Sequence, residues 1–174
     1  GETMASLADR QAAVRADHRF YVWMAVAFAA TGFLGFVPTY WARLATGSFD
    51  GNPITHIHGM LFFGWTLTWL VQTSLVARGN TAMHRSFGIF GAALFSAMMC
   101  TVLLAVLNEI RVYDALGVGD ATRRFVAVPL VALASLVGLF TLALMRTGQP
   151  AVHKRLMVLT MAPTVAFAAD TTSD

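Results

Sequence analysis

Five apolar segments, separated by short polar stretches, constrain what this chain of 174 residues folds into. They lie at about residues 20–41, 54–77, 87–107, 125–145 and 151–169. An α-helix rises about 1.5 Å per residue, so about 20 apolar residues cross the roughly 30 Å hydrocarbon core of a bilayer. The first four segments have this length. The uncharged part of the fifth is shorter and contains Pro163, so it spans only if the basic residues before it lie at the interface.

The composition places the chain in the membrane class. Hydrophobic residues make up 57% of it and charged residues 12%, against about 25% charged in a typical soluble domain. We expect an all-α integral membrane protein with about five transmembrane helices: an N-terminal segment over 1–19, one transmembrane domain over 20–170 and a tail over 171–174. The single Cys100 excludes a disulfide within the chain.

The basic residues predict the orientation. Eight of the twelve fall on the side of the N-terminus, namely Arg10, Arg15, Arg19, Arg78, Arg85, Arg146, Lys154 and Arg155. By the positive-inside rule the N-terminus is then cytoplasmic. The net charge of +3 therefore reads as a topology signal, and we expect a lipid bilayer rather than nucleic acid as the partner.

The stretch PITHIHGM opens the second apolar segment with two histidines. Asn52 suits a helix N-cap and Pro53 the first helical position. In a helix beginning there, His56 and His58 point about 200° apart, so they do not clamp one metal ion together. His58 shares a face with Trp65 and Gln72. Helix packing with a bonded Gln72 is the favoured interpretation of that face, and a cofactor or quinone pocket is the alternative.

A short internal repeat links two loops on the N-terminal side. Residues 79–85 read GNTAMHR and residues 148–154 read GQPAVHK, with Gly, Ala and His identical. The second and third segments then form one helix hairpin and the fourth and fifth another, as parallel repeats that build a four-helix core.

The repeat makes His84 and His153 equivalent, in the same leaflet and able to face each other. Paired histidines on facing helices are the axial ligands of a six-coordinate b-type haem. Arg85, Lys154 and Arg155 would bind its propionates. Gly88 and Gly91 would admit a flat macrocycle. The alternative is that the histidines anchor helix ends, the basic residues hold lipid phosphate and the glycines serve helix packing.

Two resemblances rest on these residues. The segments His58…Gln72…His84-Arg85…Gly88 and His153-Lys154-Arg155-Leu156-Met157 resemble a family of uncharacterised bacterial multi-helix membrane proteins, over roughly residues 55–164. This resemblance implies the bacterial inner membrane and no particular activity. The chain is more distantly similar to cytochrome b561-type proteins, whose four-helix core carries two haems. That similarity implies one haem b on His84 and His153; a second would need a partner for His58 early in the fourth segment, where no histidine stands.

Three functions follow as hypotheses. The first is a b-type-cytochrome-like protein that carries electrons with a quinone or another redox partner. The second is a cofactor-free accessory subunit packed against other membrane subunits or against copies of itself. The third is a transporter or metal-handling protein with His56 and His58 at its entrance. Hydrolytic chemistry has no support, because we find no nucleophile elbow, phosphate loop or paired carboxylates, and we expect no catalytic residue.

Overall fold

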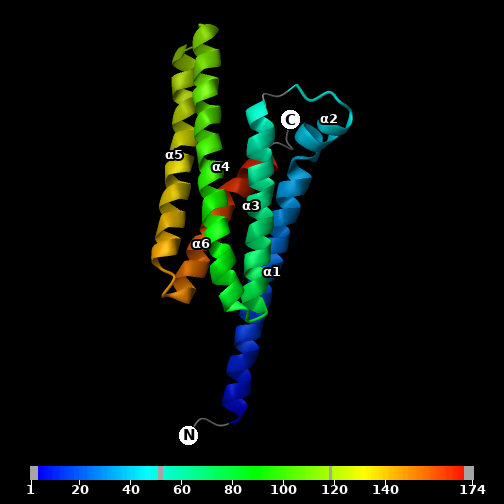
Figure 1. The fold of residues 1–174 in the computed structure, drawn as a ribbon, viewed down its shortest axis with the longest axis vertical. Coiled ribbons are helices and arrows are strands. Elements are labelled where there is room, and N and C mark those ends of the chain that lie inside the picture. Colours follow the sequence, from blue (N-terminus) through cyan, green and yellow to red (C-terminus); the bar gives the residue numbers. More distant parts are fainter. Residues whose placement is uncertain (1–3, 51–52, 118, 171–174) are drawn as a thin grey trace.

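The computed structural model describes residues 4–50, 53–117 and 119–170, with side chains except at 5, 109, 119–125 and 164–170. The expected N-cap Asn52 and the tail 171–174 lie outside these residues. The described chain is helical, which confirms the all-α class (Figure 1). Its elements are α1 (Met4–Gly35), the π-helix η1 (Val37–Trp41), α2 (Ala42–Ala45), α3 (Pro53–Ala77), α4 (Thr81–Ala115), α5 (Gly119–Met145) and α6 (Pro150–Asp170).

Four helical runs in the described residues are long and apolar enough to cross a membrane: Ser6–Ala45, Pro53–Ala77, Thr81–Ala115 and Val126–Met145. The outward-facing side chains are largely apolar, as at Ile89, Leu104 and Val131. A surface of this kind suits lipid rather than water. The expectation of a membrane protein is therefore met in the length and the apolar composition of these helices. The shorter α6, which carries Pro163, is not among the four runs.

Two helices extend beyond the apolar segments that predict them. α4 begins at Thr81, where the Asn80 side chain accepts a hydrogen bond of 3.1 Å from the Met83 amide, and continues to Ala115. α1 begins at Met4 and projects as a single helix past the rest of the bundle (Figure 1). The predicted boundaries at residues 87, 107 and 20 mark where apolar sequence begins or ends. The polar residues that flank the apolar segments continue the same helices.

The five long helices form a ring, in which each packs on two others of the five. The order is α1, α3, α4, α5, α6 and back to α1. Figure 1 shows α6 running obliquely behind α3 and α4. α4 and α6 are separated by α5, and no pair of their described Cα atoms lies within 8 Å. Side chains that point to the ring axis from these two helices therefore meet across its centre.

An aromatic cluster fills the middle of the ring. Trp65 of α3, Phe95 of α4 and Phe140 of α5 have ring centroids 4.0 to 5.5 Å apart. Ala25 of α1 and Met161 of α6 close the cluster, each only 1% exposed. This core holds the five helices together and separates the two ends of the bundle.

Candidate functional site

His84 and His153 occupy the same position in their helices. Each is the fourth helical residue, in α4 and α6 respectively. The His84 amide donates to the Asn80 carbonyl at 3.1 Å, and the His153 amide donates to the Gln149 carbonyl at 2.9 Å. The loops differ before that point, since Gly79 has a φ of +76° whereas Gly148 is not among the left-handed glycines. The likeness of residues 79–85 and 148–154 thus extends to the helix starts that carry the histidines.

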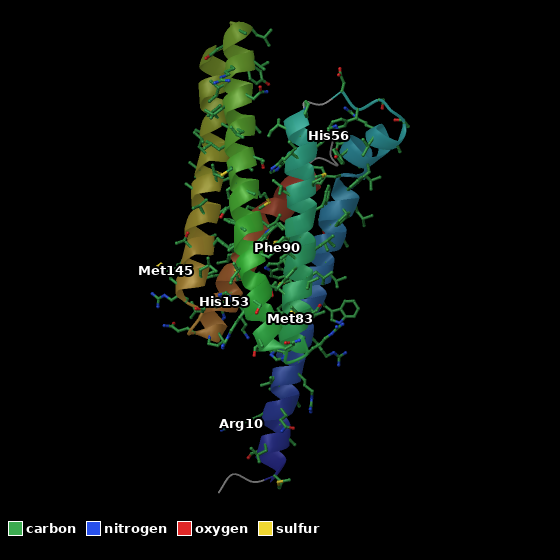
Figure 2. All side chains as sticks on the ribbon, in the orientation of Figure 1. Arg10, His56, Met83, Phe90, Met145 and His153 are labelled. Carbon is green, nitrogen blue, oxygen red and sulfur yellow. The ribbon has the colours of Figure 1, made fainter. Side chains whose placement is uncertain are left out.

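The structure brings the two imidazoles together. Their ring centroids are 6.4 Å apart and their planes meet at 76°. Figure 2 shows His153 at the same end of the bundle as Met83, the residue before His84. Because α4 and α6 do not pack on each other, the two side chains reach across the interior of the ring.

Each ring has a nitrogen able to bind a metal ion. The Nδ1 of His153 lies 2.8 Å from the Ala143 carbonyl oxygen. A carbonyl can only accept, so this Nδ1 carries a hydrogen, and in the neutral ring Nε2 then has a free lone pair. A ring nitrogen held in this way on a backbone carbonyl is the usual support of a metal-bound histidine. In His84, Nδ1 is buried and has no hydrogen-bond partner, and the backbone of Gln72 lies beside the ring.

The spacing and the number of ligands fit a haem iron better than a bare ion. Imidazole nitrogens bind first-row metals at about 2 Å, so two rings on opposite sides of one ion have centroids about 6 Å apart. The described residues contain no group of three or more His, Cys, Asp and Glu side chains that could hold a metal. Zinc takes at least three protein ligands. A b-type haem brings its own four nitrogens and needs only two.

The three basic residues expected at the propionates have different surroundings. Lys154 is already engaged, because its Nζ lies 2.6 Å from Asp17 Oδ2 and 4.8 Å from the centroid of the Tyr21 ring. Arg85 and Arg155 are exposed at the same end and remain open to an anionic group.

The two glycines on α4 make room for side chains of α3. A Cβ atom at Gly88 would lie 3.6 Å from Gln72 Nε2, and one at Gly91 would lie 3.5 Å from Thr68 Cγ2. This close approach favours packing as the role of both glycines over a surface for a macrocycle. The Gln72 Oε1 atom is buried, and no partner for it is found in the described structure. Gln72 therefore borders His84, and its Oε1 atom lacks the bonded neighbour that we expected.

His56 and His58 lie at the other end of α3 and engage different helices. The Nδ1 of His58 lies 3.0 Å from Thr101 Oγ1 of α4. The Nδ1 of His56 lies 3.0 Å from the Tyr40 hydroxyl of η1. His58 precedes Gln72 by 14 residues, or about 21 Å of helix, so it does not belong to the His84 site.

Sequence reasoning missed several residues around the pair. Asp17 and Tyr21 lie one helical turn apart, and an acid beside an aromatic at the start of an apolar segment was a readable signal. No sequence signal indicated that the Ala143 carbonyl would accept a hydrogen bond from His153. No protein-family model, curated protein or solved structure matches the chain.

Proposed function

We propose that the chain is a membrane-embedded b-type cytochrome that holds one haem b between His84 and His153. The observation that carries the proposal is the 6.4 Å separation of two imidazoles that reach across the ring from α4 and α6. Each presents a nitrogen not used in a hydrogen bond within the described structure. Interfacial anchoring does not require two histidines to face each other inside the bundle.

The residues of the chain would divide the work. His84 and His153 would hold the haem iron, and the Ala143 carbonyl would orient the His153 ring. Arg85 and Arg155 would pair with the propionates, because both are cationic and exposed beside the histidines. When bound, the haem supplies one-electron chemistry, with a potential that depends on its ligands and its burial. The aromatic core around Trp65 keeps water from entering the site along the ring axis.

The orientation and topology belong to the same proposal. With the N-terminus cytoplasmic, the histidine pair lies near the cytoplasmic face of the inner membrane. α6 serves as a fifth, short span, and the hairpins α3–α4 and α5–α6 are the two repeats. Electrons would pass to or from a quinone or a redox partner that reaches this face.

The first experiment is the visible absorption spectrum of the detergent-purified protein, air-oxidised and then reduced with dithionite. We expect a Soret band and a sharp reduced α-band. His84→Ala and His153→Ala should each abolish the α-band, while His56→Ala, a matched change at the other end of the bundle, should retain it. Full retention of the band in both of the first two variants would refute the site.

A cofactor-free accessory subunit is the second candidate. The packing of α3 side chains over Gly88 and Gly91 favours it, because these glycines then serve only helix association. A protein that stays colourless after haem addition, from cells replete in haem, would make this candidate the leading one. Its co-purifying membrane subunits would then be the next measurement.

A further inference from the structure

The position of His153 is not set by contact between the helices that carry the two histidines. In the described residues no Cα atoms of α4 and α6 lie within 8 Å of each other. α6 is held from its two sides instead, by α5 and by α1. On the α5 side, the His153 ring is bonded to the Ala143 carbonyl. The α1 side needs a corresponding attachment if the first turn of α6 is to hold one orientation.

Asp17 and Tyr21 provide that attachment through Lys154. The Lys154 ammonium lies 2.6 Å from Asp17 Oδ2, and 4.8 Å above the Tyr21 ring. Asp17 and Tyr21 are four residues apart, so they share one face of α1 and together form a cradle for one cation. The Lys154 and Asp17 side chains are 35% and 43% exposed, which leaves the pair only partly screened by solvent.

We propose that Asp17 and Tyr21 are positioning residues for the histidine pair. By holding Lys154 they fix the rotation and depth of the first turn of α6, and so aim the neighbouring His153 at His84. This inference rests on the proposed function. It also reassigns Lys154, whose ammonium is used inside the protein rather than on a propionate.

The test compares three variants in the haem-loaded protein. Asp17→Asn removes the charge at nearly constant shape, and Asp17→Glu restores it. Asp9→Asn is the matched control, because Asp9 is an exposed acid two turns earlier on the same helix. We expect Asp17→Asn to release haem to apomyoglobin about two- to fivefold faster, the range that a partly exposed ion pair supports. The low-spin ferric electron paramagnetic resonance signal should also broaden, since the angle between the two imidazoles becomes less uniform.

Asp17→Glu should recover most of both effects, and Asp9→Asn should show neither. Equal haem release and equal spectra in Asp17→Asn and Asp9→Asn would overturn the proposal. If Asp17→Asn fails to fold, Tyr21→Leu takes its place, because it removes the ring under the ammonium and leaves the ion pair. Tyr21→Leu with parental haem release and spectra would then overturn the proposal.

A second measurement does not depend on haem. Spin labels on Val14→Cys of α1 and Val152→Cys of α6, in a Cys100→Ser background, report the distance between the two helices. We expect Asp17→Asn to broaden the distance distribution and Asp9→Asn to leave it unchanged. If the protein binds no haem but Asp17→Asn still broadens the distance distribution, the proposed function is refuted and the attachment of α6 to α1 through Lys154 is supported. Unchanged distances in Asp17→Asn refute the positioning role, whether or not haem is bound.

Discussion

Replacing Thr101 with Val tests the hydrogen bond that joins α3 to α4 near His58. The Thr101 hydroxyl lies 2.8 Å from the Met98 carbonyl and 3.0 Å from His58 Nδ1. The carbonyl can only accept, so the hydroxyl donates to Met98 and its oxygen accepts from the His58 Nδ1–H. Val keeps the shape of the side chain, which is 8% exposed, but offers no acceptor. Thr101→Val therefore leaves one imidazole N–H between the helices without a partner.

The expected loss is about 1 kcal/mol of unfolding free energy. Hydrogen bonds between membrane helices contribute about 0.6 kcal/mol on average and about 1.7 kcal/mol at most. A buried donor left unpaired costs about 1–3 kcal/mol. The lower part of that range applies, because the His58 side chain is only partly buried and can turn toward another acceptor.

The assay is reversible unfolding in mixed detergent, followed by circular dichroism. Thr66→Val is the matched control. Thr66 is 2% exposed, and among the described residues its hydroxyl bonds only to the Phe62 carbonyl of its own helix, at 2.9 Å. The reasoning fails if Thr101→Val costs no more than Thr66→Val, or if a double-mutant cycle with His58→Leu shows coupling below about 0.3 kcal/mol. Any haem spectrum should be unchanged, since this contact lies at the other end of α3.

Three further changes test the packing. Trp65→Ala should cost about 3–5 kcal/mol of unfolding free energy, because the side chain is 2% exposed and packs on Phe95 and Phe140. A loss under about 1 kcal/mol in the same unfolding assay would contradict the aromatic core. Gly91→Ala should be nearly neutral, since its Cβ would meet Thr68 Cγ2 at an ordinary 3.5 Å, whereas Gly91→Leu should cost about 1–3 kcal/mol by forcing α3 and α4 apart. Gly79→Ala should cost about 1–2 kcal/mol of unfolding free energy, because Gly79 has a φ of +76°. Gly148→Ala should be neutral or slightly stabilising, because a Cβ atom there would meet no atom within 4 Å. Equal melting temperatures for these two variants would refute the difference between the loops.

The helices could be predicted from the sequence because a bilayer requires long apolar segments, and such segments are directly readable. The ends of the helices could not be predicted in the same way. Asn80 caps α4 before its apolar part begins, and residues 4–19 continue α1 before its apolar part begins. The π-helix Val37–Trp41 was also missed, because the first apolar segment was expected to run as one helix through Pro38 to residue 41.

The His84–His153 contact was predicted because the two loops carry the same residues at the same offset from a helix start. This prediction needs only the position of each histidine relative to the start of its own helix. The partners of the other histidines depend on how each helix is rotated in the ring, which local register does not determine. Thr101 and Tyr40 were therefore not predicted as partners of His58 and His56, although each is a polar residue in an apolar stretch.

The ring arrangement explains how histidines in a first helical turn come to lie in the interior. A basic or polar residue at a helix start normally faces lipid headgroups. In a ring of five helices, however, two helices separated by one other helix lie across the axis from each other, as α4 and α6 do here. α3 is the direct neighbour of α4, which is why the Gln72 backbone lies beside His84 rather than beside His153. A change at Gln72 should accordingly disturb His84 first, whereas a change at Asp17 should disturb His153 first. The two histidines are held by different parts of the ring, so their orientations can be altered one at a time.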